Sequence, residues 1–140
     1  MLTFNNLNYI LYEKMMKQQI ELIGQNVPSK KNSKIITKSK RVISSKLVQY
    51  YERWATPRLK EQLPTWQEMI QNKPLPLKVS FYFYRDSKRK WDFVNIVQVL
   101  ADLMQKEGYL NDDDTKNFIP LYIGEEVTTK KEAGVIMTIE

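Results

Sequence analysis

The chain has 140 residues, which is enough for one domain with a sizeable core and too few for two independent domains. Its 22 Lys and Arg residues outweigh its 16 Asp and Glu residues, and the net charge of +6 favours an anionic partner such as nucleic acid. Cysteine and histidine are absent, so any catalysis has to use carboxylates, Lys, Tyr, Ser or Thr, without disulfides, thiolate zinc sites or His-based nucleophiles. No apolar run approaches the roughly 20 residues that span a membrane, and no signal-peptide pattern opens the chain, so we expect a cytoplasmic protein.

The character of the sequence changes sharply at Gln18. Before it, apolar residues such as Leu7, Leu11 and Met15 recur at helical spacing. We therefore expect residues 1–17 to form an N-terminal extension or accessory helix, and residues 18–140 to form the domain.

Alternating apolar residues predict a short strand over 19–23, which leads into a loop of turn formers and cations from Pro28 onward. Apolar residues then recur at helical spacing from Leu47, and Pro57 is expected to break or kink that helix. The capping-box spacing of Thr65–Glu68 predicts a second short helix.

The clearest strand lies over 77–84, where apolar and polar or tyrosine side chains alternate before a basic loop over 85–90. A helix is expected from Asp92 to about Lys106, ending at Gly108, and two further strands over 118–123 and 135–139. This order predicts a small two-layer α/β (α+β) domain, with helices packed on a mixed sheet of about four strands.

The helix that begins near Asp92 is apolar around most of its circumference, which is typical of a largely buried helix. Asn95, Gln98, Asp102 and Gln105 form one polar stripe along it. Polar groups on a buried helix need partners, so Asp102 should be paired, hydrogen-bonded or facing a wet cleft. Gln105 is expected on the solvent side.

Carboxylates flank both ends of this helix. Asp92 stands where it could cap the helix or face a metal ion, and Asp112–Asp114 place three acids in a row. Hard cations such as Mg²⁺ take carboxylate ligands. A helix of about 15 residues spans roughly 22 Å, so its two ends do not meet within one subunit by helix geometry alone. Either the acidic loop folds back alongside the helix, or the three acids form a solvated loop.

The cations cluster in two loops that leave strands. Carboxylates framed by such loops suit a phosphodiester nuclease, in which cations hold the DNA backbone and carboxylates hold the metal. Solvated basic loops are the commoner explanation of such charge runs. The candidate DNA-binding residues are Lys30, Lys31, Lys34, Lys88, Arg89 and Lys90.

Five segments in a fixed order resemble the RusA family of Holliday junction resolvases found in bacterial prophages. They are Pro28–Ser33, Lys88–Asn95, Asp102–Leu103, Gly108 and Asp112–Asp113. The family pattern is a basic loop, D-x-D-N, a helix carrying Lys and then Asp-Leu, a Gly, and a D-D pair four residues on. The resemblance extends from about Gln19 to the C-terminus.

The resemblance implies a small dimeric nuclease that binds four-way DNA junctions, cuts them symmetrically in recombination and repair, and uses Mg²⁺, or alternatively Mn²⁺. Asp92 matches the first Asp of D-x-D-N, and Asp112 and Asp113 match the D-D pair. These three are then the catalytic and metal-binding residues. Asn95 matches the Asn of the first motif and Asp102 the Asp of Asp-Leu, and both would support the site.

Two positions depart from the family pattern. Val94 stands where the family has its second catalytic Asp, and Gln98 stands where it has a Lys. A missing ligand weakens the metal site unless Asp86 or Asp112 substitutes. Two functions therefore remain open: a metal-dependent endonuclease that resolves junctions, and a catalytically weakened or inactive protein that binds junctions or other nucleic acid. A third reading is an unrelated basic α/β protein.

Overall fold

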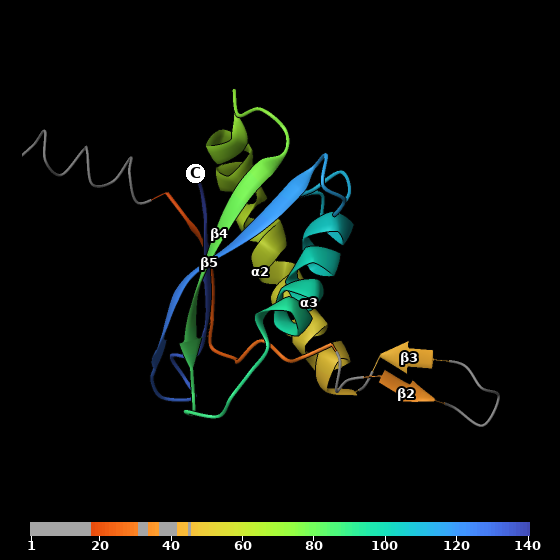
Figure 1. Ribbon diagram of the computed structural model, residues 1–140, viewed down its shortest axis with the longest axis vertical. Helices are drawn as coiled ribbons and strands as arrows, with labels where there is room; N and C mark the ends of the chain where they lie inside the picture. Colours follow the sequence, from red (N-terminus) through yellow and green to blue (C-terminus); the bar gives the residue numbers. More distant parts are fainter. Residues whose placement is uncertain (1–17, 31–33, 37–41, 45) are drawn as a thin grey trace, which may run out of the picture.

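The computed structural model describes residues 18–30, 34–36, 42–44 and 46–140 (Figure 1). The elements follow in the order β1 (Ile20–Ile23), β2 (Lys34–Ile36), β3 (Val42–Ser44), α2 (Lys46–Ile70), β4 (Leu77–Arg85), α3 (Phe93–Lys106), β5 (Phe118–Val127) and β6 (Gly134–Ile139). The predicted N-terminal extension lies outside the described residues, so the division at residue 17 remains a prediction. Within the described ranges no helix is long and apolar enough to cross a membrane.

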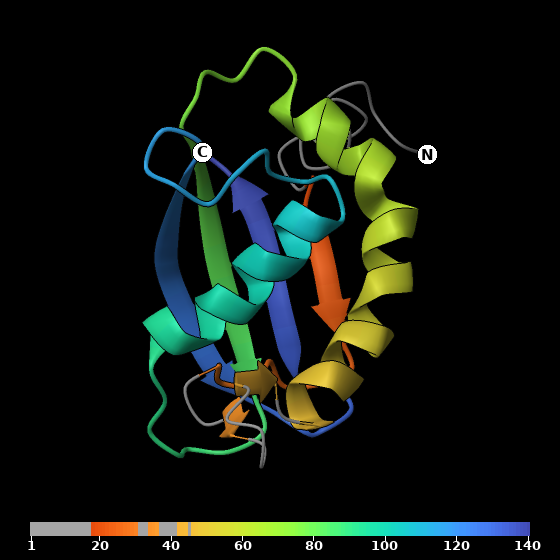
Figure 2. The same cartoon turned by 90° about the vertical axis from the view of Figure 1, so that its right-hand side faces the viewer.

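Four strands form one mixed sheet in the order β1-β6-β4-β5. Strands β4 and β5 are parallel, while β6 is antiparallel to both of its neighbours, β1 and β4. Parallel neighbours need a crossover, and α3 supplies it. Figure 2 shows α2 and α3 covering the same face of this sheet. The predicted two-layer α+β fold with about four mixed strands is confirmed.

The central strand β4 carries the predicted alternation. Val79, Phe81 and Phe83 are fully buried beneath the helices, whereas Tyr82 and Tyr84 are half-buried. Because successive side chains of a strand point to opposite faces, these three residues form one row of the core. The rings of Phe81 and Phe83 lie 6.1 and 5.9 Å from the Phe93 ring, so this row supports the start of α3.

Helix α2 continues through both of its prolines, Pro57 and Pro64, so the predicted division into two helices is wrong. A proline inside a helix removes a backbone hydrogen bond and costs about 3 kcal/mol. This cost is offset because α2 buries side chains on both sides of the prolines, including Leu59 and Trp66. Full burial of one such side chain contributes about 1.5–3 kcal/mol. The capping-box spacing at 65–68 thus lies inside a helix and starts none.

The segment after Pro28 is also more regular than predicted. Strands β2 and β3 form an antiparallel hairpin that pairs Ile35 with Ile43, within a stretch that sequence patterns assigned to a basic loop. Short β-branched runs favour strands, but three residues are too few for a periodic pattern to stand out. Strand β5 is likewise longer than predicted and ends at Val127.

Candidate functional site

Helix α3 is largely buried, as predicted. The buried side chains are Ile96, Val97, Val99, Leu100, Ala101, Leu103 and Met104. Val94 is the apolar exception, since 60% of its surface is exposed, and Gln98 is exposed one turn further along. Gln105 is exposed too, which confirms the solvent side predicted for it. The two positions that depart from the family pattern therefore lie on the outer side of α3.

Asp92 occupies the N-cap position of α3 with an extended backbone, φ −116° and ψ 111°, but its side chain makes no capping hydrogen bond. The Asp92 carboxylate instead accepts a hydrogen bond of 3.0 Å from the Asn95 side-chain amide. Side-chain capping is therefore excluded as its role. Asp92 is exposed at the helix N-terminus, where the macrodipole favours negative charge and Asn95 restricts the carboxylate's orientation.

Asp102 has the partner that its place on a buried helix demands. Its carboxylate forms an ion pair with the Lys30 ammonium, while the Lys30 backbone N–H donates to the Asn95 carbonyl at 3.0 Å. The Lys30 side chain therefore runs along α3 from residue 95 to residue 102. Lys30, a candidate DNA-binding residue, thus also holds the segment after Pro28 against the helix.

The other candidate cations lie in different settings. Lys88, Arg89 and Lys90 are exposed in the loop between β4 and α3, directly before Trp91 and Asp92. Lys31 lies outside the described residues, and for Lys34 only the backbone in β2 is described. The loop that leads into α3 therefore carries three solvent-facing cations within four residues of Asp92 in the sequence.

The acidic loop lies beyond the opposite end of α3. Asp112 accepts a hydrogen bond of 2.7 Å from the Asp113 backbone N–H. Asp114 accepts hydrogen bonds from the Asn117 backbone and side chain, at 3.1 and 2.7 Å, and so shapes the turn into β5. The Asp112 and Asp113 side chains are exposed. The acidic run thus combines one structural residue, Asp114, with two exposed carboxylates.

One subunit does not bring the predicted carboxylates together. Helix α3 has 14 residues, about 21 Å at 1.5 Å per residue, and Asp92 and Asp113 flank its two ends. Figure 2 shows the loop after α3 at the opposite end of the sheet from the start of that helix. The acidic loop therefore does not fold back alongside α3. Among the residues that the structure describes, no group of three or more acidic side chains could hold a metal ion.

Asp86, the candidate replacement for the missing carboxylate, is engaged by Asn26. Its carboxylate accepts a hydrogen bond from the Asn26 side-chain amide, and its backbone N–H donates to the Asn26 side-chain oxygen at 3.2 Å. This reciprocal pair ties the end of β4 to the segment that follows β1. Asp86 therefore has a structural role that the sequence alone did not reveal.

A cluster around Trp91 adjoins Asp92 and was missed by sequence reasoning. The Glu125 carboxylate accepts hydrogen bonds from the Trp91 indole at 2.7 Å and from the Tyr122 hydroxyl at 2.8 Å, and these bonds lower the pKa of Glu125. The Arg85 guanidinium lies 4.9 Å from the Trp91 ring centroid and donates to the Val27 carbonyl at 3.2 Å. Burial lowers the pKa of Arg85. Glu125 stands on β5, 34 residues from Trp91, and no local motif marks it.

Fold and site together define a small α+β domain in which a basic loop precedes an exposed carboxylate at the start of a buried helix. Residues 25–140 match the family model described as Endodeoxyribonuclease RusA. The match covers most of the chain, so the chain belongs to the RusA endodeoxyribonuclease family, which confirms the resemblance seen in the sequence. A comparison with curated proteins found no match.

Proposed function

We propose that the protein is a metal-dependent endonuclease that resolves four-way DNA junctions in recombination and repair. Family membership supports the nuclease class. The observation that carries the proposal is the Asp92 carboxylate, which is exposed at the N-terminus of α3, unused by capping and directly preceded by a cationic loop. We expect the protein to act in the cytoplasm of a bacterium that carries a phage or prophage.

Each group has a definite task in this proposal. Lys88, Arg89 and Lys90 bind backbone phosphates, while Asn95 orients the Asp92 carboxylate through its 3.0 Å hydrogen bond. The donor set fits Mg²⁺ or Mn²⁺, since exposed carboxylate oxygens are the ligands that hard cations take. When bound, such a cation activates water and stabilises the leaving oxygen of the phosphodiester. The ion pair between Lys30 and Asp102 supports the site from the side of α3.

The proposal includes a homodimer for a geometric reason. Because α3 separates Asp92 from Asp112 and Asp113 by about 21 Å, a metal held by both groups requires the acidic pair of a second subunit. A two-fold dimer would build two such sites by the same contact. Two sites are also what the symmetric cutting of two strands requires.

A second candidate is a non-catalytic protein that binds branched DNA. The observation that favours it is the pair Val94 and Gln98, both on the exposed side of α3, where the family has a carboxylate and a cation. In this case the basic loops would still bind phosphates, but no turnover would follow.

One assay separates the two candidates. A labelled four-way junction, and a linear duplex of matched length as control, are incubated with the protein with and without Mg²⁺ or Mn²⁺, and binding and cleavage are scored separately. The endonuclease predicts paired, metal-dependent nicks in the junction and a dimer by light scattering. Tight junction binding without cleavage supports the second candidate. Equal affinity for junction and duplex by a monomer removes both.

A further inference from the structure

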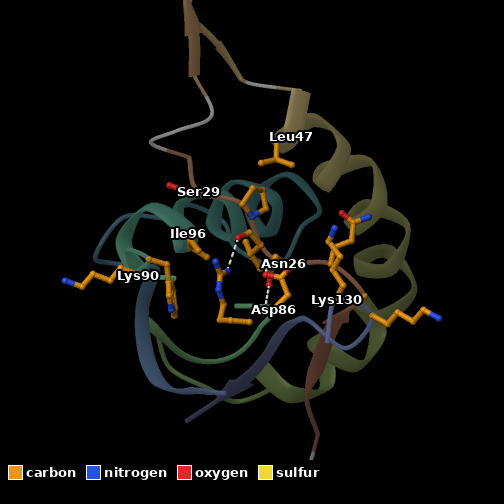
Figure 3. A pocket seen from close by; sticks show the side chains of 14 residues that line it. Asn26, Ser29, Leu47, Asp86, Lys90, Ile96 and Lys130 are labelled. Atoms are coloured by element: carbon orange, nitrogen blue, oxygen red, sulfur yellow. Dashed lines mark hydrogen bonds between the residues drawn. The ribbon is translucent and has the colours of Figure 1, made fainter. Parts of the chain in front are cut away.

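A pocket of about 700 Å³ opens at the end of the sheet where α3 begins (Figure 3). Five separate segments line it: residues 24–29 after β1, the first turn of α2, the end of β4 with the loop to α3, the first turn of α3, and the turn between β5 and β6. Its volume lies in the range of about 300–1,000 Å³ that small-molecule sites occupy. The acidic loop does not contribute to it.

The polar part of the pocket is strongly cationic. Arg85, Lys90, Lys130 and Lys131 line it, and Asp86 is the one carboxylate among the lining residues. Figure 3 shows Lys90 and Lys130 on opposite sides of the Asn26 and Asp86 pair. Asp86 is held in place by its reciprocal hydrogen bonds with Asn26, and its single negative charge leaves the lining net positive. An anionic ligand is therefore favoured.

The turn that carries Lys130 and Lys131 is itself held in place. The Thr128 backbone N–H donates to the Arg85 carbonyl at 2.7 Å, and the Thr128 hydroxyl donates to the Glu132 carboxylate at 2.7 Å. The first bond fastens the start of the turn to the end of β4, and the second closes the turn between β5 and β6. The two lysines are thus presented at a fixed edge of the pocket.

The remaining wall is apolar. Val27 and Pro28 are buried beneath it, Ile96 belongs to the core, and Leu47 keeps 65% of its surface exposed in the first turn of α2. Trp91 is oriented by its hydrogen bond to Glu125. An apolar wall beneath a cationic edge complements a ligand with a flat apolar part and a phosphate.

We propose that this pocket binds one unpaired nucleotide of a DNA strand, with its base against Leu47 and Trp91 and its phosphate beside Lys130 and Lys131. The inference rests on the proposed function only in taking DNA as the ligand. Junction centres and strand ends offer unpaired bases, and such bases stack on aromatic side chains with little dependence on sequence. The turn between β5 and β6 is then a DNA-contacting element in addition to the loops identified from the sequence.

The phosphate contacts proposed for Lys130 and Lys131 are tested by measuring the affinity of the full chain for a fluorescent oligothymidylate. The measurement is made without divalent metal at several salt concentrations. Lys130→Ala with Lys131→Ala should weaken binding about tenfold and reduce the salt slope by about 1.4, since each single-strand contact contributes about 0.7. The matched control is Lys60→Ala with Lys73→Ala, which removes the same charge from exposed lysines outside the pocket. Equal effects of the two double variants would overturn the assignment.

The proposed contact between the base and the apolar wall is tested with an abasic oligonucleotide of equal length. The wild-type chain should bind it about tenfold more weakly than oligothymidylate, and Leu47→Ser should reduce that preference. Leu47 is mostly exposed, so the variant is expected to fold, which circular dichroism checks. Equal wild-type affinity for both oligonucleotides would exclude a base pocket, and thymidine monophosphate binding as tightly as the strand would exclude a strand site. These assays need no cleavage, so they can succeed where the nuclease proposal fails.

Discussion

Restoring the family's carboxylate and cation on α3, by Val94→Asp with Gln98→Lys, should raise metal-dependent junction cleavage without destabilising the protein. Val94 is 60% exposed, so less than half of its burial free energy is lost, about 1 kcal/mol at most. An acidic side chain in the first helical turn regains about 0.3–1 kcal/mol from the helix dipole. The new charges at positions 94 and 98 are one turn apart and contribute a further 0.2–0.5 kcal/mol or so.

Repulsion between the new carboxylate and Asp92 opposes these gains by roughly 0.5 kcal/mol at the exposed helix end. The free energy of unfolding should therefore stay within about 1 kcal/mol of the wild type, which urea unfolding measures. Loss of a group that only hydrogen-bonds to a metal ligand lowers metal affinity or catalytic activity by about 10- to 100-fold. Restoring a direct ligand should therefore raise the rate of cleavage by on the order of tenfold or more.

The matched control is Val94→Asn with Gln98→Lys. Asn has the same size as Asp, so this variant keeps the new cation at position 98 but lacks the new carboxylate at position 94. Initial rates of junction cleavage are compared across a Mg²⁺ titration. An unchanged rate in a well-folded Val94→Asp, Gln98→Lys protein would refute the reasoning, because another group would then already fill the role of the missing ligand.

Three further predictions address the site and the fold. Asp92→Asn and Asp113→Asn should each abolish cleavage while junction binding stays intact or tightens, and wild-type turnover in either variant would remove that residue from the mechanism. Replacing all of Lys88–Lys90 by Ala should lower junction affinity and reduce the salt slope by about 2.7, since each duplex contact contributes about 0.9. Trp66→Phe should cost about 2–4 kcal/mol in urea unfolding, because it leaves a cavity and removes the 2.9 Å hydrogen bond from the buried indole to the Tyr109 carbonyl. A cost under about 0.5 kcal/mol would show that neither effect matters there.

Local periodicity was enough to predict two of the elements that pack against the core, β4 and α3. The alternation over 77–84 predicted β4, and the apolar circumference after Asp92 predicted a buried α3 whose Asp102 needs a partner. These inferences succeed because a strand and a helix repeat every 2 and every 3.6 residues, so one buried face is visible in the sequence. Helix geometry also predicted that the two ends of α3 lie roughly 22 Å apart, but it left open whether the acidic loop folds back alongside the helix, and only the structure showed that it does not.

Only the tertiary structure decided which distant groups meet. The Lys30 ammonium forms an ion pair with Asp102, 72 residues further along the sequence. The Glu125 carboxylate accepts a hydrogen bond from the Trp91 indole, which lies 34 residues earlier. The continuity of α2 through Pro57 was likewise decided by packing, because burial of its apolar face outweighs the lost hydrogen bond. Such contacts depend on how the sheet and helices are stacked, and a local sequence pattern does not predict that stacking.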